Sequence, residues 1–473
     1  MRNLKALALL PIYFVASTSM LAGGKGSDVV KGKELGQWVQ ITKPTMLRHL
    51  VENISRPGTA PGSVVASPST FDPNYYYHWI RDAALVMDII VTEYSQAVDP
   101  IIKNSYRRML FDYTWFSRSN QTIWTPSGGP GEPKYNVDGS AYNEPWGRPQ
   151  NDGPALRALT LTRFANLLLE EGRHDVVRDI LYDGTVNSVI KTDLEFVSSH
   201  WQDPCFDLWE ETYGGHFYTL VSSHRSLKEG AKLARLLNDA EAATKYEQQS
   251  RAIEYSLRGY WNENIGAFIA SINPWLVMSG NPGQPLYGRS GLDASVILGL
   301  LHSNASDDLL PFSDDRVQAT VAKLENEFQR IYQVNNKGFQ GIAIGRYPED
   351  RYNGYTTDGE GNPWFLTSLG FGEYYYRLAN HLEKLGKIEI TSRNAEFYKK
   401  MGIATPVDFA RALTRIREKG DDFVVVAKFH MDQEFRMSEQ INRYSGYMQG
   451  ATDLTWSYAS FLTAISHAKF SYR

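Results

Sequence analysis

The stretch GNPWFLTSLGFGEYYYRL, residues 361–378, contains the signal that decides the fold. Asn362 offers a side-chain cap for free backbone N–H groups, and Pro363 fits the first helical position, where no N–H is needed. The apolar and aromatic residues from Trp364 onwards predict a helix over 364–378. This helix begins abruptly, directly after a polar loop.

Similar start signals recur along the chain, each with an Asp, Asn or Gly before a run of helical periodicity. They predict further helices at 82–91, 152–169, 216–234, 293–302 and 453–464. A second set of helical stretches lies before or between these, at 45–53, 101–116, 175–189, 240–260, 317–332 and 409–418. Two alternating sets predict an all-α (α/α)6 barrel with six inner and six outer helices, long loops and a few short strands, such as 423–429.

The loops before the predicted inner helices hold aromatic and charged residues in unusual density. They read YYYHWIRD (75–82), WGRPQND (146–152), DLWEE (207–211), GRYPED (345–350) and SEQ (438–440). Inner helices of such a barrel run parallel to one another, so the loops before them gather at one mouth. We therefore expect tryptophan, arginine and carboxylate side chains from five loops to line one funnel.

The composition is that of a globular protein with a large core. Of the 473 residues, 42% are hydrophobic and 22% charged, and no low-complexity linker divides residues 40–473, which predicts a single domain over 30–473. The net charge of -4 excludes the broadly basic face of a protein that binds nucleic acid or an acidic membrane. Aromatic residues reach 13%, including 28 Tyr and 11 Trp, a surplus that suits stacking on sugar rings as well as core packing.

Cysteine usage and the missing motifs point away from redox and metal chemistry. Cys205 is the only cysteine, so no internal disulfide and no Cys-rich zinc or iron–sulfur site can form. The sequence also lacks the HExxH, P-loop and GxGxxG motifs, and we expect no metal and no cofactor. We interpret Cys205 as a small buried group near the site, and His224 as a core histidine.

The N-terminus has the layout of a secretory signal peptide. Arg2 and Lys5 precede an apolar stretch at 6–16, which is too short to span a bilayer. We predict a signal peptide over 1–22, with a disordered apolar tail as the alternative. The Asn-x-Ser/Thr candidates for N-glycosylation are Asn53, Asn120 and Asn304. Together these features predict the secretory pathway, with an extracellular, vacuolar or ER-lumen destination.

Cleavage of a glycosidic bond needs two carboxyl groups in different environments. One protonates the leaving oxygen, and the other activates water or attacks as a nucleophile. Glu210 lies between Trp209 and Glu211, an aromatic face and a like charge that both favour a protonated acid. The alternative for Glu210 is a carboxylate stabilised at a helix N-terminus, and for Glu439 an ordinary surface position.

The other loop residues have structural alternatives as well. Arg81 and Asp82 form either a helix cap with a surface ion pair or a clamp for sugar hydroxyls. The tyrosine run before them and Trp79 favour the clamp. Trp146 and Trp364 are core residues by default. Their shared location in the same loops is the argument for function.

At these loops the chain resembles the fungal glucoamylases, glycoside hydrolases of family 15 with an (α/α)6 catalytic barrel. The matching runs lie at 67–70, 75–82, 131–138, 146–154, 207–211, 345–350, 361–366, 437–440 and 453–458. They follow the family's order and cover most of residues 60–465. The resemblance implies inverting exo-hydrolysis of α-1,4-linked maltooligosaccharide, dextrin or glycogen ends, with release of β-D-glucose and without metal. We expect a monomer.

The resemblance also implies roles for single residues. Glu210 matches the general acid and Glu439 the general base. Glu211 matches the carboxylate at the second glucose. The residues that match the clamp on the terminal glucose are Arg81, Asp82 and Arg346, and those that match the aromatic wall are Tyr75, Trp79, Trp146 and Trp364.

Two departures from the family leave alternatives open. Many members carry a starch-binding domain, which we do not expect here, so adsorption to raw starch is expected to be poor. Members often have disulfides, so their absence keeps open a protein retained in a vacuole with glycogen as substrate. Competing hypotheses are another exo-glucosidase on the same barrel, such as a trehalase or dextran glucosidase, and a catalytically silent sugar-binding protein.

Overall fold

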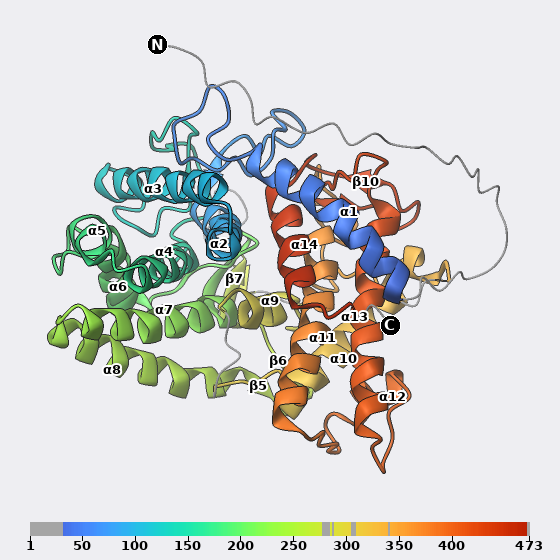
Figure 1. Cartoon of the computed structure of the whole chain (residues 1–473). Helices are drawn as coiled ribbons and strands as arrows, with labels where there is room; N and C mark the ends of the chain where they lie inside the picture. Colours follow the sequence, from blue (N-terminus) through green and yellow to red (C-terminus); the bar gives the residue numbers. More distant parts are fainter. Residues whose placement is uncertain (1–31, 277–283, 286–287, 304–308, 339–340, 471–473) are drawn as a thin grey trace.

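The computed structural model describes residues 32–276, 284–285, 288–303, 309–338 and 341–470. Within them, six helices form a closed inner ring, because each helix packs against the next and the last packs against the first (Figure 1). In chain order the ring consists of α2 (Ile80–Gln96), α4 (Asp152–Glu170), α7 (Phe217–Leu236), α9 (Ser295–His302), α11 (Phe365–Leu385) and α14 (Thr455–His467).

A second layer of helices covers the ring. It consists of α1 (Gly32–Val51), α3 (Pro100–Thr122), α6 (Val189–His200), α8 (Ala240–Leu257), α10 (Asp315–Ile331) and α13 (Phe409–His430). Along the ring, α3 packs on α2, α6 on α4, α8 on α7, α13 on α11 and α1 on α14, whereas α10 contacts α12 (Ala395–Lys400). The predicted (α/α)6 barrel is therefore confirmed.

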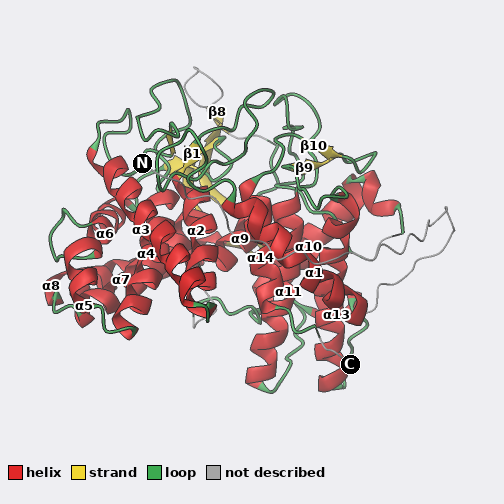
Figure 2. Ribbon diagram, turned by 45° about the horizontal axis from the view of Figure 1, so that its top comes forward, coloured by secondary structure: helices red, strands yellow, loops and turns green. Residues whose placement is uncertain are grey.

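Short strands lie among the long loops at one end of the barrel (Figure 2). A four-stranded sheet has the order β3 (Cys205–Phe206), β4 (Thr212–His216), β7 (Ser271–Leu276) and β8 (Gln284–Pro285). The two-stranded pairs are β1 (His78–Trp79) with β2 (Lys134–Tyr135), β5 (Trp261–Asn262) with β6 (Ala267–Phe268), and β9 (Gln440–Ile441) with β10 (Met448–Gln449). These pairs hold the loops in place around the mouth.

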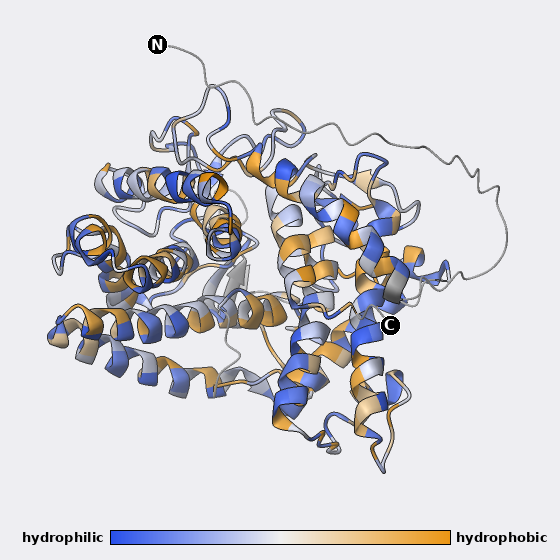
Figure 3. Ribbon diagram, in the orientation of Figure 1, coloured by the Kyte–Doolittle hydropathy of each residue, from blue (hydrophilic) through white to orange (hydrophobic). Residues whose placement is uncertain are grey.

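Hydrophobic residues concentrate on the helix faces that meet inside the two layers (Figure 3). Inner helices are buried almost all round, and α9 is buried from Ser295 to Leu301. Part of the aromatic surplus also belongs to the core. Tyr374 and Tyr375 of α11 are buried, and their hydroxyls donate to the carbonyl of Phe312 and the carboxylate of Glu325. These aromatic side chains therefore pack the core and are not available for stacking on sugar rings.

Helix capping differs between the two layers. The outer helices α3, α8, α10 and α13 each begin with an Asp whose side chain accepts a backbone N–H: Asp99, Asp239, Asp314 and Asp408. In the six inner helices the N-cap residue itself makes no side-chain hydrogen bond to the helix. At α9, however, the preceding residue Asp293 accepts the backbone N–H of Ser295 at 2.7 Å. Asn362, predicted as a cap, instead donates to Gln440. Most polar groups at the inner N-termini therefore make contacts other than capping.

Two predicted elements were wrong. The run 175–189 is not the outer helix: α5 (His174–Val176) and a π-helical turn at Val177–Leu181 end there, and the outer helix α6 follows. The strand-like run 423–429 lies within α13, where its apolar residues pack on α11. In both cases a short apolar run could not distinguish helix from strand or fix the boundary.

Several predictions about processing fall outside the structure or conflict with it. The predicted signal peptide at 1–22 and the sequon at Asn304 lie outside the described residues. Asn53 and Asn120 are each 2% exposed, and Asn53 donates its amide to Thr455 across the core, so neither side chain is available to carry a glycan in the folded protein. No helix in the described part of the chain is long and apolar enough to cross a membrane.

Candidate active site

A pocket of about 250 Å³ opens where the loops before the inner helices meet. All ten predicted site residues line it: Tyr75, Trp79, Arg81, Asp82, Trp146, Glu210, Glu211, Arg346, Trp364 and Glu439. The remaining lining residues are Ala66, Leu208, Trp209, Tyr352, Thr357, Leu454 and Trp456. Of these, only Trp209 was named from the sequence, as the neighbour of Glu210, and none was assigned to substrate binding. The expected funnel is thus a pocket built from segments far apart in sequence.

Glu210 lies in the tight turn that joins β3 to β4. Its backbone adopts a φ of 66°, a left-handed conformation that costs free energy for a residue with a side chain. The Asp207 carboxylate stabilises the turn by accepting the backbone N–H groups of Glu211 and Thr212 at 2.9 and 2.8 Å. A strained residue held by its surroundings in this way is typical of a functional position.

The Glu210 carboxylate is held from two other loops. Its Oε1 accepts the indole N–H of Trp79 at 2.7 Å and the amide of Gln150 at 3.0 Å. A guanidinium nitrogen of Arg81 lies 3.6 Å from the same oxygen, and Arg81 also donates to Gln150 and Asp152. Glu210 is therefore fixed by groups that precede α2 and α4.

The sequence neighbours of Glu210 point elsewhere. Trp209 donates its indole N–H to Asp293 at 3.0 Å, and burial raises the pKa of Asp293 to about 7. Glu211 pairs with Arg346 at 2.7 Å and with Arg289 at 3.0 Å. Burial alone would raise the pKa of Glu211, but these two guanidinium groups hold it below its ordinary value. The aromatic ring that contacts the Glu210 carboxylate comes from Trp79 instead.

Glu439 is anchored on the far side of the pocket. Its backbone N–H donates to Ala451, and its Oε2 accepts the Tyr352 hydroxyl at 3.2 Å. That hydroxyl is also 2.9 Å from the hydroxyl of Tyr75. The side chain is completely buried, and burial raises the pKa of Glu439 to about 8, although the two tyrosines and Arg346 act in the opposite direction.

An aromatic wall links the partners of the two carboxylates. The ring of Trp79, which holds Glu210, lies 5.6 Å from the ring of Tyr75, which is linked through Tyr352 to Glu439. Trp146 extends this wall at 6.0 Å from Trp79. Each carboxylate thus has its own partners, although both face one pocket.

Polar atoms without a hydrogen-bond partner collect at this pocket. Among the described residues, they include the indole N–H groups of Trp146, Trp364 and Trp456 and the Oε1 of Glu439. Buried polar atoms in proteins are almost always paired, so such a concentration needs an explanation. A ligand rich in hydroxyl groups would supply both the acceptors and the donors that these atoms lack.

Cys205 and His224 lie where the sequence placed them. Cys205 is buried in β3, and burial raises the pKa of its thiol to about 12, so the thiolate that a nucleophile needs is not accessible at neutral pH. His224 is buried within α7.

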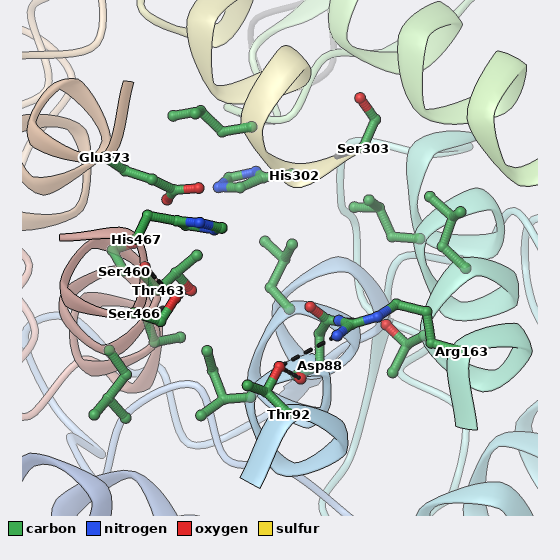
Figure 4. Close-up of a pocket in the computed structure, with 18 of the residues that line it drawn as sticks. Asp88, Thr92, Arg163, His302, Ser303, Glu373, Ser460, Thr463, Ser466 and His467 are labelled. Atoms are coloured by element: carbon green, nitrogen blue, oxygen red, sulfur yellow. Dashed lines mark hydrogen bonds and ion pairs between the residues drawn. The ribbon is translucent and has the colours of Figure 1, made fainter. Parts of the chain in front are cut away.

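A larger cavity, of about 400 Å³, lies inside the ring between residues of the inner helices (Figure 4). Its charged groups pair with one another: Arg163 with Asp88, Arg377 with Glu373, and Arg225 with Glu229. Its lining includes no tyrosine or phenylalanine, and its single indole, Trp456, is shared with the smaller pocket. The smaller pocket, which has an aromatic wall and two carboxylates with separate partners, is therefore the candidate active site.

Comparisons with known proteins agree with this geometry. A model of the family described as "Glycosyl hydrolases family 15" matches residues 41–466. The chain is 38% identical to a glucoamylase of Blastobotrys adeninivorans, over 88% of this chain and 68% of that protein. It is 33% identical to a probable glucoamylase of Schizosaccharomyces pombe, over 95% of both chains. The solved glucoamylase from Saccharomycopsis fibuligera superposes with a TM-score of 0.83 at 31% identity, covering 93% of this chain and 97% of that one.

Proposed function

The chain belongs to the glycosyl hydrolases of family 15 and is a starch-degrading glucosidase of the glucoamylase type, and we propose from this premise that it inverts the anomeric carbon. In the proposed reaction it removes single glucose units from the non-reducing ends of α-1,4-linked maltooligosaccharides, dextrins or glycogen and releases β-D-glucose. The observation that supports the proposal is the pair Glu210 and Glu439, which line one pocket with separate sets of partners.

Glu210 is assigned as the general acid. Trp79 and Gln150 both bond to its Oε1, so we assign the other oxygen, Oε2, to protonate the departing glycosidic oxygen. The bonds to Oε1 fix the plane of the carboxyl group, and a fixed orientation is what an acid needs to meet one particular lone pair. Arg81 follows Trp79 closely in the chain and would hold hydroxyls of the same glucose.

Glu439 is assigned as the general base. Tyr352 fixes its Oε2, and we assign Oε1 to accept a proton from the attacking water. Burial, which raises the pKa of Glu439 to about 8, makes its carboxylate a stronger base than a solvated one. A raised pKa would also suit an acid, so this assignment rests on the family's runs, and the variants described in the Discussion separate the two roles.

The lining of the pocket supports attack on chain ends. Trp456 lines both this pocket and the cavity inside the ring, and the Arg81 guanidinium lies 5.8 Å from the centre of its ring. Asp82 and Arg346 line the same pocket, so the terminal glucose would meet charged groups and an indole together. We propose that Glu211, held by Arg346, binds the second glucose. A pocket that ends at these groups would admit one chain end and give exo action.

The anomer released first tests the proposed inversion. We expect β-D-glucose as the first product from maltoheptaose, because the base-activated water attacks the face opposite to the leaving oxygen. Proton NMR of the anomeric signals, recorded within the time before mutarotation, checks this. Initial appearance of α-D-glucose would contradict inversion without contradicting the glucosidase activity.

Linkage preference separates this proposal from its competitors. Maltose, isomaltose and trehalose are offered to the same purified protein, and glucose is measured. Preference for maltose supports the proposal, whereas preference for isomaltose or trehalose identifies a dextran glucosidase or a trehalase. Tight binding of maltooligosaccharides without any glucose would identify a silent sugar-binding protein.

The Tyr352 hydroxyl is expected to set the acidic limb of activity. It donates to the Glu439 carboxylate and so stabilises its charged form. In Tyr352→Phe the pKa of Glu439 rises further, and because the base works only when deprotonated, the rising limb of kcat/KM against pH moves to higher pH. The control Tyr94→Phe removes a hydroxyl bonded to Glu171, remote from the pocket, and should leave that limb in place. If the rising limb of kcat/KM against pH stays in place in Tyr352→Phe, the result argues against Glu439 as the base.

A further inference from the structure

Lys134 is a buried cation surrounded by aromatic rings. Its side chain is 2% exposed. The ammonium nitrogen lies 3.5 Å from the ring centre of Trp146, 4.0 Å from those of Tyr77 and Tyr142, and 4.7 Å from that of Trp79. A cation this close to a ring face is attracted by the π electrons. Four rings at once form what we call the aromatic cage.

The cage is a closed circuit of ring contacts. Tyr77 packs edge-on against Trp79 at 6.0 Å, and Trp79 against Trp146 at 6.0 Å. Trp146 meets Tyr142 at 5.9 Å, and Tyr142 returns to Tyr77 at 5.2 Å. Each ring therefore supports two others as well as the cation. Removal of the central ammonium would therefore take away one contact from each of the four rings.

Strand pairing brings Lys134 to this centre. Lys134 of β2 stands directly opposite Trp79 of β1 in an antiparallel pair. Residues opposite each other in such a pair project from the same face, so the lysine stem and the indole run side by side. The following strand residue, Tyr135, is paired with His78 and buried in the core. The position of the ammonium is thus fixed by the backbone.

Two members of the cage also belong to the candidate active site. Trp79 and Trp146 line the pocket, whereas Tyr77, Tyr142 and Lys134 do not. Trp79 donates its indole N–H to the Glu210 carboxylate at 2.7 Å. The cation and the assigned acid therefore both contact one indole, the first over its ring and the second at its N–H.

We propose that Lys134 is a positioning residue for the reaction: its caged ammonium orients Trp79 and Trp146, and through the Trp79 indole it orients the Glu210 carboxylate. This inference rests on the proposed function, because it acts through the assigned acid. Without the cation, the four rings lose the contact that they share, and the indole that holds Glu210 is less firmly oriented.

Charged groups also surround the cage. Glu210 lies 3.6 Å from Arg81, with Asp82 and Asp152 beside that arginine. Burial and the Arg148 guanidinium together lower the pKa of Lys134 to about 8, while the Glu210 carboxylate acts in the opposite direction.

Three variants test the proposal, with wild-type glucose release from maltose measured first. Lys134→Met keeps the length of the side chain and removes the charge. Lys134→Arg keeps the charge but is too large and planar for a cage formed around an ammonium. Tyr142→Leu removes one ring that does not touch the pocket. Each variant is measured for kcat, KM, the pH profile of kcat/KM and tryptophan fluorescence.

In Lys134→Met we expect kcat to fall roughly tenfold to a hundredfold while KM changes little, because the acid is misplaced and not lost, and we expect the tryptophan emission to shift. Lys134→Arg should lower kcat as well, and Tyr142→Leu should lower it less than either. If Lys134→Met does not fold, the other two decide. Wild-type kcat and unchanged tryptophan emission in the variants that fold overturn the proposal. A wild type that releases no glucose overturns the proposed function instead, and the fluorescence shift still tests the cage.

Discussion

Replacement of Glu210 or Glu439 by glutamine is expected to lower kcat on maltose by roughly 10²–10⁴-fold, the usual contribution of a positioned acid or base. Glutamine keeps the shape of the side chain, so the unfolding temperature should stay close to that of the wild type. For Glu439 the glutamine also replaces a buried ionisable group by a neutral amide, which removes the cost of burying its charged form. Both variants should therefore lose activity while they keep an unfolding temperature close to that of the wild type.

A control and a second substrate sharpen this experiment. Glu360 is exposed and bonds only to nearby loop residues, so Glu360→Gln should retain full activity. α-D-Glucosyl fluoride has a leaving group that needs no proton, so Glu210→Gln should recover much of its rate on it, whereas Glu439→Gln should not. The opposite pattern would exchange the two roles. Near-normal glucose release from maltose by either variant would reject that residue as catalytic.

The barrel could be predicted from the sequence because helix starts and periodicity are local signals. However, several of the polar residues that marked the predicted helix starts do not act as caps. Asp82, read as a cap, lies in the first turn of α2 and faces the pocket, and Asp152 of α4 binds Arg81. Asp293 does accept a backbone N–H at the start of the inner helix α9, but most such caps, among them Asp239 and Asp408, belong to the outer helices. The polar residues that were used to predict helix starts therefore include residues of the candidate active site.

The partners within the site could not be read from the order of residues. Sequence adjacency suggested Trp209 and Glu211 as the environment of Glu210, but the tight turn sends all three side chains in different directions. Tyr352 follows the run 345–350 and carries no signal of its own, although it holds Glu439. Contacts of this kind form where loops that are far apart in sequence meet. A local sequence pattern cannot predict which loops meet.

Gly450→Ala is expected to inactivate the enzyme while Gly386→Ala does not. Both glycines have a positive φ, 76° and 71°, so an alanine costs each a similar amount, about 1 kcal/mol of stability. A Cβ at Gly450 would lie 2.4 Å from the Oε2 of Glu439, whereas a Cβ at Gly386 meets nothing within 4 Å. Backbone strain is therefore matched in the two variants, and only the contact with the assigned base differs.

The added methyl group at position 450 would displace the Glu439 carboxyl from its place beside Tyr352. A displacement of about 1 Å in a catalytic group can cost roughly 10²-fold in rate, so kcat of Gly450→Ala should fall by that order. Gly450→Ala should lower the unfolding temperature more than Gly386→Ala, because its methyl group also clashes with a buried side chain. Calorimetry checks this difference, and glucose release from maltose by the folded protein gives kcat. Equal kcat in the two variants would mean that the position of Glu439 is not critical, and the assignment of the base would have to be abandoned.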